Sequence, residues 1–152
     1  MDKKCGQHKL EGRILAIDYG ERRIGLAVSD PLYITAQGLD TLTKSGKINF
    51  AGEIARICGE YGVGRIVIGL PLTMAGKKST AAERVAQFAD ELKKVVNIPI
   101  DFLDERLTSV AAKRALTEMG YKTGHRKELV DRTAAILLLQ SYLDGLHQRA
   151  EE

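Results

Sequence analysis

The order of the short apolar runs constrains the fold of this chain more than any other feature. Runs over 13–17 and 24–28 are separated by the turn-forming residues of D-Y-G-E-R-R, which is typical of a β-hairpin. A third strand is predicted over 34–43. Apolar residues then recur at helical spacing over 48–61, and Gly62 is well placed to end that helix. The first third of the chain therefore predicts three strands followed by a helix.

Strands and helices alternate in the next part of the chain. The run R-I-V-I-G-L over 65–70 is rich in β-branched residues and predicts a buried strand of the kind found in parallel sheets. A helix is expected from an N-cap at Ser79 to about Val95. A strand over 98–103 follows, and Pro99 favours a place at the edge of the sheet because proline interrupts a ladder.

Two more helices are expected in the last third. The first begins at a cap on Thr108 or Ser109 and ends before Gly120, and the second covers 127–146. The complete order β-β-β-α-β-α-β-α-α predicts an α/β fold, in which a mixed sheet carries helices on its faces.

The length of 152 residues predicts a single domain over 13–147, with flexible tails at 1–12 and 148–152. The longest apolar run, over 134–139, is far shorter than the ~18 residues of a membrane span, and the first residues do not resemble a signal peptide. The two cysteines form no metal-binding or disulfide pattern. We therefore expect a soluble, cytoplasmic protein with no membrane partner.

Positive charge is concentrated in one segment. The whole chain has a net charge of +3, whereas 106–127 contains six basic residues and one acid. A local basic stretch on a nearly neutral protein predicts a contact surface for a polyanion, although a solvated helix face and loop would look the same. The candidate nucleic-acid contacts, with basic residues near the expected site added, are Arg22, Arg23, Lys77, Lys78, Arg106, Lys113, Arg114, Lys122, Arg126 and Lys127.

Three acidic residues lie at the ends of apolar stretches, at positions where the side chain is expected to face the core. Asp18 continues the alternation of Ile14 and Ala16, so its carboxylate is expected on a core-facing side. One of the consecutive Asp104 and Glu105 must point the same way if the strands are neighbours. Asp131 precedes an apolar stripe on the last helix. Three converging carboxylates would make an all-oxygen site, and such sites select Mg²⁺ or Mn²⁺.

Each acid also has a structural interpretation. Asp18 could form an Asx turn with its own backbone. Glu105 could pair with Arg106 on the surface, where an ion pair contributes little. Asp131 could simply stabilise a helix N-terminus. The residue pattern alone leaves these alternatives open.

Four ordered motifs resemble the YqgF family, which is also called the RuvX or Holliday-junction-resolvase-like family. They are D-Y-G-E-R-R-I-G-L-A-V-S-D over 18–30, I-G-L-P-L-T-M-A-G over 68–76, D-E-R-L-T over 104–108 and V-D-R-T-A-A over 130–135. The resemblance implies an RNase H-like fold with a five-stranded sheet. It also implies a divalent-metal nuclease site, with Mg²⁺ or Mn²⁺ held by Asp18, Glu105 and Asp131.

The resemblance implies a hydrolase that cleaves phosphodiester bonds in structured nucleic acid. Its expected substrate is the 5′ end of the precursor of 16S ribosomal RNA, within ribosomal precursor particles, and the alternative is a four-way DNA junction. Junction cutting would call for a symmetric dimer that places two sites on two strands. No dimer stripe is visible in the sequence, so a monomer and a homodimer are both expected possibilities. A third alternative is a ribosome-assembly factor that binds nucleic acid without cleaving it.

Overall fold

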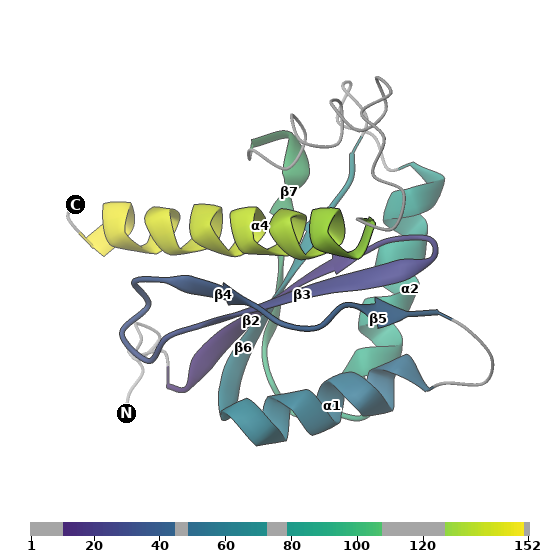
Figure 1. The fold of residues 1–152 in the computed structure, drawn as a ribbon, viewed down its shortest axis with the longest axis horizontal. Coiled ribbons are helices and arrows are strands. Elements are labelled where there is room, and N and C mark those ends of the chain that lie inside the picture. The colour runs from purple at the N-terminus through teal and green to yellow at the C-terminus, as the bar shows by residue number, and fades with distance from the viewer. Residues whose placement is uncertain (1–10, 45–48, 73–78, 108–126, 151–152) are drawn as a thin grey trace.

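A mixed β-sheet lies at the centre of the computed structural model, which describes residues 11–44, 49–72, 79–107 and 127–150 (Figure 1). The strands lie in the order β4-β3-β2-β6-β7, and β5 also pairs with β3. β2 pairs antiparallel with β3 and parallel with β6, and β6 pairs parallel with β7. The predicted α/β class with a mixed sheet is therefore confirmed. The strands are β2 Arg13–Tyr19, β3 Arg23–Ser29, β4 Ala36–Gly38, β5 Leu42–Thr43, β6 Val63–Leu70 and β7 Ile100–Asp104.

The predicted third strand over 34–43 is divided into two short strands, so the sheet has six strands instead of five. The carboxylate of Asp30 accepts hydrogen bonds from the backbone N–H groups of Leu32, Ile34 and Thr35, which therefore cannot join a ladder. Between β4 and β5, Leu39 turns into the core, and its N–H donates to the carbonyl of Leu26.

Helices cover both faces of the sheet, as predicted (Figure 1). α1, Phe50–Tyr61, and α2, Thr80–Lys93, pack on one face, and α4, Lys127–Ala150, packs on the other. The predicted stop at Gly62 is confirmed, because this residue ends α1 with the positive φ that glycine adopts without strain. The predicted N-cap at Ser79 is also confirmed, because its side chain accepts from the N–H of Ala82.

The limits of the folded part differ from the prediction at both ends. Gly12, expected in a flexible tail, packs against the backbone of Gly62 and Gly64, and its carbonyl accepts a hydrogen bond from the hydroxyl of Tyr33 at 2.6 Å. α4 continues to Ala150, beyond its predicted end at 146. The helix expected after Thr108 lies outside the described residues. No helix among the described residues is long and apolar enough to cross a membrane.

The alternation along β2 decides which helix each of its side chains meets. Leu15 and Ile17 belong to the core shared with α1 and α2, whereas Ile14 and Ala16 belong to the core under α4. Because successive side chains of a strand point to opposite faces, Asp18 is on the α4 face. The position of the candidate site therefore follows from the packing of α4.

Candidate active site

Asp18 lies near the end of the central strand and is buried, with 4% of its surface exposed. It pairs with Gly25 of β3 in the antiparallel ladder, and the turn of the hairpin begins only at Gly20, whose N–H donates to the carbonyl of Arg23. The backbone of Asp18 therefore belongs to the ladder and not to the turn. A carboxylate this deeply buried needs hydrogen bonds, an ion pair or a metal ion to offset the loss of its hydration.

Glu105 reaches the same face from a neighbouring strand. It opens the short 3₁₀ helix Glu105–Leu107 directly after β7 and is 5% exposed. Its carboxylate lies over Gly69 of β6, because a Cβ atom built on Gly69 would be 2.6 Å from Oε2 of Glu105. Gly69 follows Ile68, the partner of Ile17, so it lies beside Asp18 in the parallel register. The carboxylate of Glu105 is therefore one strand away from Asp18.

Asp104 points to the other face and has a different environment. The guanidinium of Arg106 donates to both of its carboxylate oxygens, with Nη2 at 2.6 Å from Oδ2. These hydrogen bonds hold the pKa of Asp104 below its usual range. The surface ion pair proposed as the alternative for Glu105 is thus made by Asp104, while Glu105 turns inward.

Asp131 approaches from above the sheet, on the helix that covers this face. It is the fifth residue of α4, and its backbone carbonyl lies so close to Gly25 that a Cβ atom there would overlap it. Gly25 is the ladder partner of Asp18, so the backbone of Asp131 is directly above the strand next to Asp18. Its side chain, 24% exposed, accepts a hydrogen bond from Nε of Arg23 at 2.5 Å.

The three predicted acids thus share one end and one face of the sheet. Two glycines make this possible, because Gly25 and Gly69 flank Asp18 on either side and have no side chain to exclude Asp131 or Glu105. In the part of the chain that the structure describes, no three acid, histidine or cysteine side chains are grouped closely enough to hold a metal ion. The donors fit Mg²⁺ or Mn²⁺ in kind, since they are carboxylate oxygens. The metal centre itself stays a prediction.

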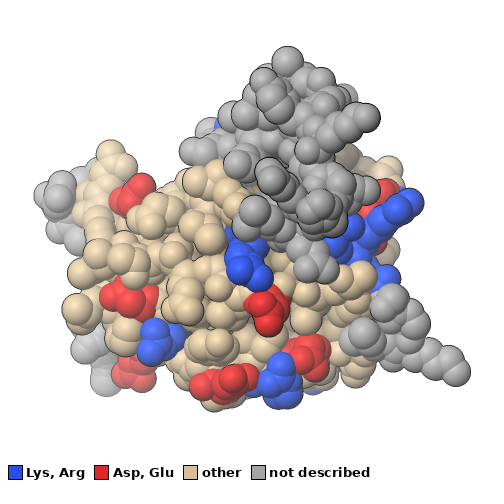
Figure 2. All heavy atoms as spheres, viewed as in Figure 1, with Lys and Arg blue, Asp and Glu red and all other residues tan. Residues whose placement is uncertain are grey.

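The predicted nucleic-acid contacts are only partly within the described residues. Arg22 is exposed at the turn between β2 and β3, whereas Arg23 contacts Asp131 and Arg106 contacts Asp104. Figure 2 shows mixed charges on the α4 side, with basic side chains gathered where the β2–β3 hairpin ends in Figure 1. Lys127 begins α4, and its side chain is not described. Outside the described residues lie Lys77, Lys78, Lys113, Arg114, Lys122 and Arg126.

Contacts that the sequence analysis did not predict fix the hairpin beside the site. The ring of Tyr19 stacks on Phe88 of α2, with ring centroids 4.4 Å apart, and the ammonium of Lys44 lies 3.5 Å from the centroid of Tyr19. An ion pair between Glu21 and Arg84 joins the turn to α2. These partners are far apart in the sequence, so no local pattern could have indicated them. The end of β2 that carries Asp18 is therefore supported from the opposite face.

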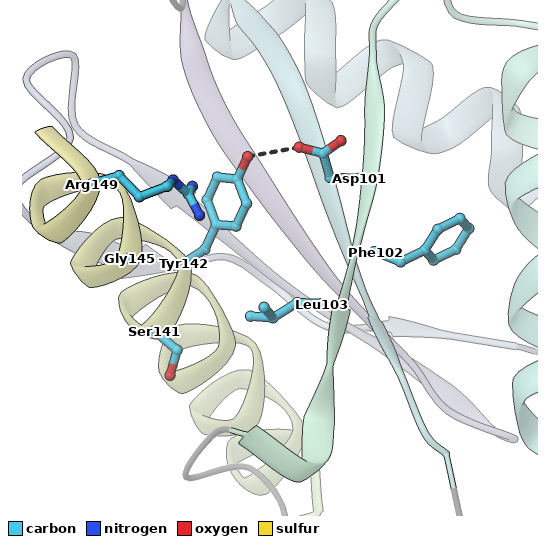
Figure 3. A pocket seen from close by; sticks show the side chains of 7 residues that line it. All are labelled: Asp101, Phe102, Leu103, Ser141, Tyr142, Gly145 and Arg149. Atoms are coloured by element: carbon cyan, nitrogen blue, oxygen red, sulfur yellow. Dashed lines mark hydrogen bonds between the residues drawn. The ribbon is translucent and has the colours of Figure 1, made fainter. Parts of the chain in front are cut away.

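A separate pocket of about 280 Å³ lies between β7 and the C-terminal half of α4 (Figure 3). Its acid, Asp101, accepts hydrogen bonds from the hydroxyl of Tyr142 and from Arg65, each at 2.8 Å. Burial and the hydrogen bond to Asp101 raise the pKa of Tyr142 to about 12. Because Asp101 of β7 bonds to Arg65 of β6 and to Tyr142 of α4 through the same oxygen, Oδ2, these side chains join the three elements at the pocket.

Comparisons with known proteins agree with this architecture. The model of the family RuvX, described as Holliday junction resolvase, matches residues 12–145. A protein of Clostridium tetani (strain Massachusetts / E88), named "Putative pre-16S rRNA nuclease", is 47% identical over 137 residues, which are 90% of this chain and 99% of the relative. A protein of Dictyoglomus turgidum with the same name is 43% identical over 88% of this chain and 95% of its own length.

Two solved structures share the fold. T. thermophilus RuvC in complex with a Holliday junction substrate has a TM-score of 0.55 at 15% identity, over 90% of this chain and 96% of that one. The Fowlpox virus resolvase in complex with Holliday junction DNA has a TM-score of 0.54 at 13% identity, over 88% and 98%. At these identities the likeness concerns the fold, and it agrees with the RNase H-like architecture predicted from the sequence.

Proposed function

The chain belongs to the RuvX family of Holliday junction resolvases, and from that membership we propose that it is a divalent-metal-dependent nuclease that processes the 5′ end of pre-16S ribosomal RNA. The family makes it a hydrolase of phosphodiester bonds. The choice of substrate follows the names of the relatives that are 43–47% identical. We place the activity in the cytoplasm, on ribosomal precursor particles.

One observation carries the assignment of the site. Asp18 lies between two glycines, and each glycine admits an acid from another element, Asp131 over Gly25 and Glu105 over Gly69. Acids that share one face repel one another, so such an arrangement lowers stability unless a cation offsets the charge. This favours a catalytic site over a purely nucleic-acid-binding protein, since a protein without catalysis has no need to keep the acids together.

The residues of this chain would divide the work as follows. Asp18, on the rigid central strand, would provide the shared ligand, with Glu105 and Asp131 as ligands on either side. A divalent ion bound there would stabilise the charge that develops on the phosphate oxygens during hydrolysis. Because the three acids come from a strand, a short 3₁₀ helix and a long helix of one packed core, their positions depend on the fold and not on the nucleic acid.

Cleavage of a four-way DNA junction is the second candidate, because the family description names it. The two candidates make different demands on the protein. A junction is cut on two strands, which needs two sites related by two-fold symmetry and hence a dimer. Processing of one RNA end needs a single site, which a monomer supplies.

The test is cleavage of two end-labelled substrates, the pre-16S rRNA 5′ leader and a four-way DNA junction, in Mg²⁺ and in Mn²⁺. Asp18→Asn should abolish cleavage and leave the melting temperature unchanged or raised, because it removes one of the repelling charges. Asp90→Asn, the same chemical change at an exposed position of α2, should cleave like the wild type. The substrate that the wild type cleaves and Asp18→Asn does not cleave identifies the activity.

Two other outcomes would count against the proposal. Cleavage by the Asp18→Asn variant would show that Asp18 is not needed for the reaction. Binding of both substrates without cleavage of either would favour the ribosome-assembly factor.

A further inference from the structure

Arg23 and Asp131 form a close contact at the edge of the site. Nε of Arg23 donates to Oδ2 of Asp131 at 2.5 Å, and both side chains are about a quarter exposed. Within the described residues, the hydrogen bond from Arg23 goes to Oδ2 of Asp131, and no donor there reaches the second oxygen, Oδ1. The contact therefore orients the carboxylate through one of its two oxygens.

Arg23 is itself held by the sheet. It is the first residue of β3, its carbonyl accepts from Gly20, and it pairs with Thr43 of β5. A side chain anchored on a paired strand gives the carboxylate a defined orientation, which a long side chain on a loop would not.

The guanidinium has more donors than this contact uses. Within the described residues, nothing accepts a hydrogen bond from Nη1 or Nη2 of Arg23, which together carry four N–H groups. The planar fork of arginine suits phosphate oxygens, and Arg22 beside it is exposed on the same hairpin turn. Nε of Arg23 thus bonds to Asp131, while the Nη groups can donate hydrogen bonds to the oxygens of a phosphodiester.

We propose that Arg23 is a positioning residue with two contacts, in which Nε orients Asp131 and the Nη groups bind a phosphate oxygen of the substrate strand. The inference rests on the proposed function, since it supposes that Asp131 is a metal ligand. Partners that orient metal ligands are worth about 10–100-fold in metal affinity. If Arg23 acted only through its positive charge, its removal would strengthen metal binding, because a nearby cation repels a metal ion.

The first test is binding of Mn²⁺ alone, measured by isothermal titration calorimetry on the full-length protein. Arg23→Gln should weaken binding by about 10–100-fold, while Arg22→Gln should bind like the wild type. Arg22→Gln is the matched control because it removes the same charge from the same turn without touching Asp131. Arg23→Lys, which can still donate one hydrogen bond to Asp131, should retain most of the affinity. Circular dichroism in EDTA checks that each variant is folded.

The second test is binding of a fluorescent four-way junction and of the labelled leader RNA in EDTA, followed by anisotropy. Arg23→Gln should weaken binding of both substrates, and Arg23→Lys should weaken it less, because the ammonium keeps the charge and spare N–H donors but not the planar fork. Wild-type affinity in Arg23→Gln would overturn the phosphate contact.

The outcomes separate this inference from the proposed function. Equal or tighter Mn²⁺ binding by Arg23→Gln would overturn the positioning role and leave metal dependence in place. Absence of a Mn²⁺ signal in the wild type, or a signal unchanged by Asp18→Asn, would overturn the metal site itself, and the positioning role with it.

Discussion

The carboxylate of Glu105 lies against Gly69, where a Cβ atom would come within 2.6 Å of Oε2. Gly69→Ala should therefore displace the end of a flexible side chain and leave the backbone in place. We expect a change in the free energy of unfolding below about 1 kcal/mol and a loss of up to about 100-fold in single-turnover cleavage, because small misplacements of catalytic groups are costly. Wild-type cleavage in this variant would show that the position of the Glu105 carboxylate is not needed.

The control for Gly69→Ala is Gly59→Ala on α1, where a Cβ atom would meet nothing within 4 Å. Alanine is a better helix former than glycine, so this variant should gain about 0.5–1 kcal/mol in stability. Its cleavage should equal that of the wild type.

Gly25→Ala should affect stability and activity together. Its added Cβ atom would overlap the backbone carbonyl of Asp131 and lie 3.5 Å from the Cβ of Ala135. Because backbone cannot rotate away as a side chain can, α4 must shift, at a cost of about 1–3 kcal/mol. Urea unfolding measures this cost, and a midpoint equal to that of the wild type would contradict the close packing of α4 on β3.

Loss of charge at the neighbouring acids Glu105 and Asp104 should affect cleavage very differently. Glu105→Gln should reduce cleavage by at least about 100-fold with little loss of stability. Asp104→Asn removes the ion pair with Arg106, whose side chain is 33% exposed, while the amide oxygen can still accept from the backbone N–H of Arg106. It should therefore cost at most about 1 kcal/mol and leave cleavage within a few-fold. Parallel cleavage assays decide between them, and the reverse order of effects would assign the site to Asp104.

Burial of Cys58 should make the stability depend on pH in the alkaline range. Loss of hydration raises the pKa of this thiol from about 9 to about 11. Between these values the unfolded chain has released the proton that the folded protein retains, so the free energy of unfolding falls as the pH rises, by at most about 1.4 kcal/mol per pH unit. Urea titrations at pH 8, 9.5 and 11 should show a smaller fall in Cys58→Ala, and an identical fall would exclude the thiol as its cause.

The basic segment predicted from the sequence can be tested through salt. Each phosphate contact contributes about 0.7–0.9 to the slope of log affinity against log salt. Replacing Lys122 and Arg126 by glutamine should therefore reduce the slope by about 1.4–1.8. The same change at Lys93 and Lys94, exposed at the end of α2, should leave it unchanged. Equal slopes in both double variants would show that this segment does not contact the nucleic acid.

Much of the fold could be read from the chain because its signals are local. The hairpin, the caps at Ser79 and Gly62 and the edge position of β7 each depend on a few neighbouring residues. The third strand begins later than predicted because the Asp30 carboxylate accepts from the N–H groups of Ile34 and Thr35. It is divided because Leu39 enters the core between β4 and β5, which no local pattern shows. The end of α4 was missed because apolar periodicity ceases before the helix does.

Motifs and periodicity are properties of the chain, so they were enough to indicate the class of the fold, the family and three candidate acids. The inward turn of Glu105, the pairing of Asp104 with Arg106 and the contact between Arg23 and Asp131 could be seen only in the folded molecule. The reason is that these choices depend on partners from distant parts of the chain. Gly69 makes room for Glu105, and the pairing of β2 with β3 brings Arg23 and Gly25 beneath α4. Local sequence places an acid on a strand, and the packing of strands and helices determines what it meets.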